Sequence, residues 1–267
     1  MQKKEKKRTK MIILIRSLFL TAVISLVAWN LFLIKEVKTS KRERAELKLN
    51  IEKVEVLEKA NRGFIKDTLR RKAIALCFWD LIKEHEDKYT RKEKEDCIQF
   101  IVMTDEKYGN KGLDAPLILA WIEKESAGNP KAVSLTGAKG LTQWMDYEAW
   151  QILTVMGYPG YDMELILDPV VNLAGGLYQL ERLLNFWEWK SIGDKSPVLF
   201  YALHTYKWGT ERTEALFQKE EKGNGQDVQY VDRILNHKVI WAEKLKYWIE
   251  DGQKLTKELQ TKKMTSD

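Results

Sequence analysis

Hydrophobic positions form two kinds of pattern along the chain. Residues 11–34 make one long apolar run that contains a single charged side chain. From about residue 73 onward, apolar side chains recur every three or four residues, as they do on one face of an α-helix. Six such stretches are separated by short polar or glycine-containing turns, at residues 73–85, 94–109, 115–126, 168–189, 196–208 and 228–257. No convincing run alternates in the manner of a β-strand, so the pattern predicts a mainly α-helical domain.

The apolar run at residues 11–34 predicts a transmembrane helix. Its 24 residues would extend about 36 Å, enough to cross a hydrocarbon core of about 30 Å. A cleaved signal peptide has a shorter apolar region that is followed by small residues, whereas this run leads directly into KEVKTSKRER. We therefore expect an uncleaved signal-anchor. Basic residues flank the run on both sides, so they favour a cytoplasmic N-terminus only weakly.

Residues 35–90 are expected to form a charged helical stalk. A loose apolar series from Leu47 to Phe64 has helical spacing but no sustained heptad repeat. This series is interpreted as a solvated helix or, alternatively, as a short coiled coil that joins two copies in a homodimer. The predicted organisation is a cytoplasmic basic tail at 1–10, the membrane helix at 11–34, the stalk at 35–90, the main domain at 91–250 and a polar tail at 251–267.

The net charge of +6 suggests nucleic-acid binding, but its distribution argues against that role. The first 16 residues, with seven lysines and arginines against one glutamate, account for the whole charge. The neutral remainder is unlike a surface that follows phosphates, so we expect no nucleic-acid partner. Cys77, Cys97 and the three histidines have no metal-ligand spacing, which predicts no metal and no cofactor. A disulfide between the two cysteines is left open.

Candidate chemistry lies at the end of the stretch at 115–126. Ile118, Ile122 and Glu125 share one helical face, so Glu125 ends an apolar stripe at the helix C-terminus. Partial burial and the negative end of the helix dipole would both raise the pKa of the Glu125 carboxyl. A carboxyl that keeps its proton near neutral pH suits a general acid. The alternative is a glutamate that simply extends from the last turn into solvent.

The segment after Glu125 is rich in turn-forming residues. It reads ESAGNPKAVSLTGAKGLTQWM at residues 125–145, and Gly137 and Gly140 bracket a tight turn within it. Glycine permits the positive φ or the close backbone approach that such a turn needs. We expect this turn to present the Gln143 amide beside the carboxyl, where it would suit hydroxyl and N-acetyl groups.

This segment resembles the catalytic domain of the soluble lytic transglycosylases, which have a lysozyme-like α fold. Further stretches are similar to the family's motifs in the family's order, from about Lys92 to about Leu235. They read LDAPLILAWIEKES, DPVVNLAGGLYQL, ALHTYKWG and QYVDRIL. The resemblance implies cleavage of the β-1,4 bond between N-acetylmuramic acid and N-acetylglucosamine in peptidoglycan. The muramic 6-hydroxyl would close a 1,6-anhydro ring, with Glu125 as the single acid/base and Tyr206 hydrogen-bonded to it.

The resemblance also places Ser126, Ser134 and Gln143 on the substrate side. Trp144 and Trp208 flank the motifs, where they would stack on sugar rings or, alternatively, belong to the core.

Four further residues are expected to serve the fold. Asn172 and Gly176 match motif positions, and Gly176 would allow close helix packing. Asp168 reads as a helix N-cap followed by Pro169 at the first helical position.

Three residues depart from the family pattern. Lys207 stands where the family has asparagine, Gln179 where it usually has tyrosine, and Gly128 where an aromatic residue usually follows the glutamate and serine. The departures affect the details of substrate contact and leave Glu125 unchanged.

The apolar run at 11–34 predicts an anchor in the inner membrane, and the resemblance implies a lyase that acts on glycan strands on the periplasmic or cell-wall side. Two alternatives stay open. One is hydrolysis by a goose-type lysozyme mechanism, and the other is a catalytically weak scaffold that binds the cell wall.

Overall fold

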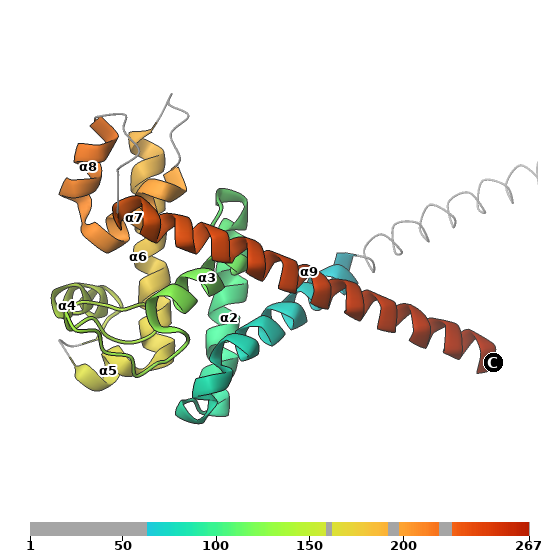
Figure 1. Cartoon of the computed structure of the whole chain (residues 1–267). Helices are drawn as coiled ribbons and strands as arrows, with labels where there is room; N and C mark the ends of the chain where they lie inside the picture. The colour runs from blue at the N-terminus through green and yellow to red at the C-terminus, as the bar shows by residue number, and fades with distance from the viewer. Residues whose placement is uncertain (1–62, 159–161, 192–197, 219–225, 267) are drawn as a thin grey trace, which may run out of the picture. The chain divides into compact units, whose positions relative to one another are not determined.

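The computed structural model describes residues 63–158, 162–191, 198–218 and 226–266. Over these ranges the chain is helical apart from loops, turns and two isolated β-bridges, which confirms the mainly α prediction (Figure 1). A first helix covers residues 63–82. The later elements are η1 (Lys83–Lys88), α2 (Arg91–Tyr108), η2 (Gly109–Lys111), α3 (Ala115–Ser126), α4 (Asp146–Val155), α5 (Met163–Leu167), α6 (Pro169–Lys190), α7 (Val198–Trp208), α8 (Thr210–Gln218) and α9 (Gln226–Ser266).

The helix boundaries follow from local capping chemistry. Thr90 and Glu93 form a reciprocal capping box at the start of α2. Asp114 caps α3 by accepting the N–H of Leu117 at 3.0 Å. Asp168 accepts the N–H groups of Val170 and Val171 at the start of α6, with proline at the first helical position, as the sequence predicts.

The core surrounds α3. Every residue from Ala115 to Ile122 is buried, which explains why this stretch is nearly continuous in hydrophobicity rather than striped. α9 packs along α3, and α6 packs against both α7 and α2 (Figure 1). Removal of one large side chain from water contributes about 1.5–3 kcal/mol, so these contacts dominate the stability of the domain.

The helix at 63–82 belongs to the domain core rather than to a solvated stalk. One compact unit begins at Lys66, well before the boundary at residue 91 that we predicted. Ile74, Cys77 and Phe78 are fully buried or nearly so within the core. Gly128 lies directly against this helix, since a Cβ at Gly128 would be 2.9 Å from the carbonyl oxygen of Leu81. This close approach gives a physical reason for glycine at a position where the family usually has an aromatic residue.

The C-terminal segment also differs from the prediction. The polar tail expected at 251–267 is instead a continuation of α9 to Ser266. A Cβ at Gly252 would lie 2.7 Å from a methyl group of Leu69, so this part of α9 still packs against the first helix.

Both cysteines are free and buried. Burial raises the pKa of the Cys77 thiol to about 11. Among the described residues, no helix has both the length and the apolar character needed to cross a membrane. The predicted membrane helix at 11–34 and the first half of the predicted stalk, residues 35–62, lie outside the described residues.

Candidate active site

Glu125 lies in the last turn of α3. Ala127 ends the helix in a left-handed conformation with φ 52°, and its N–H donates to the carbonyl of Glu123 at 2.9 Å. Only 4% of the Glu125 side chain is exposed. The carboxyl is therefore buried more completely than the sequence predicts, and it stays near the negative end of the helix dipole.

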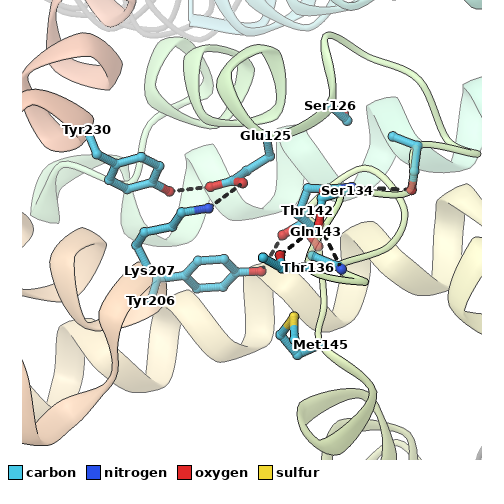
Figure 2. A network of polar contacts seen from close by, with 12 residues as sticks. Glu125, Ser126, Ser134, Thr136, Thr142, Gln143, Met145, Tyr206, Lys207 and Tyr230 are labelled. Carbon is cyan, nitrogen blue, oxygen red and sulfur yellow. Dashed lines mark hydrogen bonds and ion pairs between the residues drawn. The ribbon is translucent and has the colours of Figure 1, made fainter. Parts of the chain in front are cut away.

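Two side chains from other helices point toward the Glu125 carboxyl (Figure 2). The Tyr230 hydroxyl on α9 donates a hydrogen bond to Oε1. The Lys207 ammonium on α7 lies 3.8 Å from Oε2 and 5.4 Å from the centre of the Tyr230 ring. Both the hydroxyl donor and the cation favour the ionised form of the carboxyl.

Burial nevertheless decides the direction of the pKa shift. Desolvation raises the pKa of Glu125, and the Lys207 cation, the Tyr230 hydrogen bond and Lys124 oppose that rise. Burial also raises the pKa of Tyr230 well above its usual range, so its hydroxyl remains a donor. Glu125 thus keeps its proton to a higher pH than an exposed glutamate, and it has two partners for the carboxylate once the proton has left. This arrangement suits one group that acts first as an acid and then as a base.

Tyr206 has a different partner from the one that we predicted. Its hydroxyl donates to the backbone carbonyl of Thr142 at 2.8 Å, and its ring packs edge-on against Trp121 at 4.9 Å between ring centres. In the structure, Tyr230 makes the hydrogen bond to Glu125 that we expected from Tyr206. Tyr206 instead joins α7 to the glycine-rich loop between α3 and α4 (Figure 2).

That loop is closed by short-range backbone contacts. Lys139 forms isolated antiparallel bridges with Val133 and Trp144. Gly137 and Gly140 have φ values of 88° and 77°, which confirms the prediction of positive φ at these glycines. At Gly140, close approach adds to conformation as a reason for glycine.

Asn172 and Gly176 of α6 pack against the loop and hold it, as expected of structural residues. A Cβ at Gly140 would lie 2.3 Å from Nδ2 of Asn172. The buried Asn172 amide accepts the N–H of Thr142 at 2.8 Å and donates to the carbonyls of Lys139 and Ile166 at 3.1 and 2.9 Å. A Cβ at Gly176 would lie 2.5 Å from Oγ1 of Thr142, which confirms the predicted close packing. The Thr142 carbonyl that receives Tyr206 is thereby held in place.

Gln143 braces the loop with the amide that we assigned to substrate. Its φ of 55° is unusual for a residue other than glycine. Nε2 donates to the carbonyls of Gly140 at 2.9 Å and Ala132 at 3.3 Å. The nitrogen thus serves the loop, and a contact of Gln143 with substrate stays a prediction.

The two predicted serines also make contacts within the chain. Ser126 Oγ donates to the carbonyl of Ile122 at 3.2 Å. Ser134 Oγ accepts the N–H of Ala138 at 3.0 Å and lies 3.0 Å from the hydroxyl of Thr136. A role for either serine in binding sugar stays a prediction.

The two candidate sugar-stacking tryptophans have different environments. Trp144 is fully buried, and a Cβ at Gly175 would lie only 2.2 Å from its ring, so the core alternative holds for Trp144. Trp208 is half-buried and packs edge-on against Tyr230 at 5.2 Å between ring centres. Trp208 therefore retains an accessible surface close to the Glu125 partners.

Sequence reasoning missed the role of Tyr230 and did not anticipate that Lys207 faces Glu125. Tyr230 lies in the QYVDRIL stretch, which we recognised as a motif without assigning its tyrosine a function. Lys207 was noticed only as a departure from asparagine. Gln179, another departure, donates to Glu148 at 3.4 Å.

Within the described ranges, no group of three or more His, Cys, Asp or Glu side chains is arranged to hold a metal ion.

Comparisons with known proteins found a matching family model and a similar solved structure. Residues 103–229 match the family model described as the transglycosylase SLT domain, just under half of the chain. The match includes Glu125, Tyr206 and Lys207 and ends one residue before Tyr230. A comparison with curated proteins found no match. Among solved structures, the chain is similar to the X-ray structure of an inactive mutant of the lytic transglycosylase Slt from Pseudomonas aeruginosa. The identity is 24% and the TM-score 0.42, and the match covers 53% of this chain and 23% of that chain.

Proposed function

We propose that the chain is a peptidoglycan lytic transglycosylase that uses Glu125 as its single acid/base. The observation that carries the proposal is a buried carboxyl with a raised pKa, held by Tyr230 and Lys207 beside a glycine-rich loop. This carboxyl lies within the segment that matches the transglycosylase SLT domain.

In the proposed reaction, Glu125 first gives up a proton and later takes one back. Protonated Glu125 gives its proton to the glycosidic oxygen as the bond from C1 of N-acetylmuramic acid to that oxygen breaks. The resulting carboxylate still accepts the hydrogen bond of the Tyr230 hydroxyl, and it then takes the proton of the muramic 6-hydroxyl. That oxygen bonds to C1 and closes the 1,6-anhydro ring, so no water is consumed.

Tyr206 and Asn172 would act through the loop rather than on the sugar. The hydrogen bond from Tyr206 to Thr142 fixes the loop relative to α7, while Asn172 fixes it relative to α6. Trp208 is the tryptophan that we retain as a candidate for stacking on a sugar ring.

The proposed location follows from the sequence outside the described residues. The apolar run at 11–34 would anchor the chain in the inner membrane with its N-terminus inside. The domain would then face the glycan strands on the periplasmic or cell-wall side. A homodimer through the segment before residue 63 is part of the same proposal.

Mass spectrometry of purified peptidoglycan tests the proposed reaction. The full chain in detergent is compared with Glu125→Gln, and circular dichroism verifies that the variant is folded. Anhydro-muropeptides, which are lighter by one water than hydrolysis products, are expected with the wild type and absent with the variant. Reducing-end products would instead indicate a lysozyme-like hydrolase, and no soluble products from folded wild type would indicate a scaffold.

A further inference from the structure

Lys207 lies on the solvent side of the buried Glu125 carboxyl. Its side chain is 45% exposed, whereas that of Glu125 is 4% exposed, so the ammonium lies between the buried carboxyl and solvent. Within the part of the chain that the structure describes, Glu125 is the one carboxylate within 4 Å of the Lys207 ammonium. Figure 2 shows the Lys207 side chain extending toward Glu125 beside the ring of Tyr230.

The contact between Lys207 and Glu125 is loose. At 3.8 Å the two atoms lie beyond the 2.7–2.9 Å typical of a charge-assisted hydrogen bond. A lysine ammonium has three donors on a flexible stem, and here it is half in water. A second anion entering from solvent can therefore take a direct hydrogen bond from Lys207 without first breaking one.

The ion pair between Lys207 and Glu125 also opposes the first step of the proposed reaction, which is protonation of the glycosidic oxygen. The Lys207 cation favours ionised Glu125, while protonation of the glycosidic oxygen needs the carboxyl to carry a proton. Oε1 already accepts the Tyr230 hydroxyl, so Oε2, the oxygen nearer to Lys207, is the one left to carry that proton. Movement of the ammonium away from Oε2 would remove this opposition.

The charge around Glu125 favours an anionic ligand. Lys124, on the exposed side of the same helical turn, adds its positive potential to that of Lys207. Glu148 on α4 acts electrostatically on Tyr206 but lies beyond ion-pair distance of Lys207. A carboxylate on the substrate is a group that the exposed Lys207 ammonium can pair with directly.

We propose that Lys207 is a specificity-determining residue that leaves Glu125 to bind a carboxylate of the incoming glycan near the scissile bond. The inference rests on the proposed function, because it names the class of glycan that the same site prefers. The carboxylate comes from one of two sources: the lactyl group of a muramic acid without peptide, or the acidic residues of an attached peptide.

Cleavage of three sets of defined glycan strands by the full chain tests the inference. The first set has free lactyl carboxylates, the second carries acidic peptides, and the third has all carboxyls blocked as amides. We expect kcat/KM for one of the anionic sets to exceed that for the blocked set by about tenfold or more, the size of one hydrogen bond to a charged group. The preferred anionic set identifies the source of the carboxylate.

Two substitutions of Lys207 and one of Lys124 make the test specific. Lys207→Gln should lose the preference mainly through a higher KM for the anionic set, and Lys207→Arg should restore it. Lys124→Gln removes a neighbouring exposed cation that contributes only to the general potential around Glu125, so it should weaken the preference far less than Lys207→Gln. Equal kcat/KM values of the wild type for anionic and blocked strands would overturn the inference. An equal loss of the preference for anionic strands in Lys124→Gln and in Lys207→Gln would also overturn it.

Calorimetric binding separates failure of this inference from failure of the proposed function. If no strand is cleaved, binding of the anionic and blocked strands to the wild type and to Lys207→Gln still reports recognition. Preferential anion binding that depends on Lys207 would support the recognition role and refute only the transglycosylase reaction. Binding without preference would refute the inference.

Discussion

Replacement of Glu125 by glutamine should make the folded protein more stable at neutral pH. The carboxylate is nearly excluded from water, which costs several kcal/mol for an ion in a protein interior. The Tyr230 hydrogen bond offsets about 1.5–3 kcal/mol of that cost. A cation at about 4 Å offsets at most about 4 kcal/mol in an effective dielectric of 20, and less here because Lys207 is half in water. Since burial still raises the pKa, the cost of desolvation exceeds what Tyr230 and Lys207 offset, and the ionised carboxyl destabilises the folded protein.

The pH dependence follows from the direction of this shift. The folded protein holds the Glu125 proton more tightly than the unfolded chain does, so the folded state loses stability as the pH rises from the unfolded value, about 4.3. The loss is complete above the folded pKa. Glutamine cannot ionise, although it can still accept the Tyr230 hydroxyl. The stability advantage of Glu125→Gln should therefore be small near pH 4 and reach its full size near neutral pH.

Urea unfolding followed by tryptophan fluorescence at a series of pH values measures this difference. Glu123→Gln is a matched control two residues away on α3, because the Glu123 side chain is 35% exposed and lies 2.8 Å from Nδ1 of His237. It should change the free energy of unfolding by less than about 1 kcal/mol, without a gain that grows with pH. A Glu125→Gln protein that is less stable than the wild type at neutral pH would show that Tyr230 and Lys207 outweigh burial, contrary to our reasoning.

Three other predictions concern the site and the packing of the domain, and the last of them has a matched control. Tyr230→Phe removes the hydroxyl donor to Glu125, which favours the ionised carboxyl, so it should move the fall in activity that reports deprotonation of this carboxyl to higher pH; an unchanged pH–rate profile would contradict the assignment. Gly176→Ala should lower the free energy of unfolding by about 1–3 kcal/mol through overpacking, measured in urea. Arg70→Met should lower the free energy of unfolding by about 3 kcal/mol, because it removes the cation that pairs with the buried Asp105 carboxylate. Arg71→Met, from an exposed ion pair, should lower it by less than about 1 kcal/mol.

Much of the local structure was predictable because its cause lies within a few residues. Asp168 and Pro169 mark the start of α6 through capping chemistry that needs no distant partner. Gly137 and Gly140 mark a turn because few other residues adopt positive φ easily. The apolar stripe that ends at Glu125 correctly indicated a shielded carboxyl.

The partners of Glu125 could not be predicted in the same way. Tyr206 and Tyr230 are 24 positions apart on different helices, and only the packing of α7 and α9 decides which hydroxyl reaches the carboxyl. A motif identifies both tyrosines but contains no information on the rotation of either helix. The first helix was predicted to be helical but was assigned to the stalk, because a charged outer face with an apolar inner face is also what a stalk would show.

The long helix α9 holds the last turn of α3 from two sides, and this explains how a glutamate at a helix end can be a well-defined acid. Glu125 Oε1 accepts the Tyr230 hydroxyl, while Glu123, which points elsewhere, accepts the indole N–H of Trp241 at 2.7 Å and lies 2.8 Å from His237 Nδ1. A terminal helical turn otherwise frays easily, because its last carbonyls lack helical partners. Contacts from one rigid helix to two residues on different faces resist rotation of that turn. The orientation of the Glu125 carboxyl thus depends on the packing of α9 along α3 as much as on the residues that touch the carboxyl.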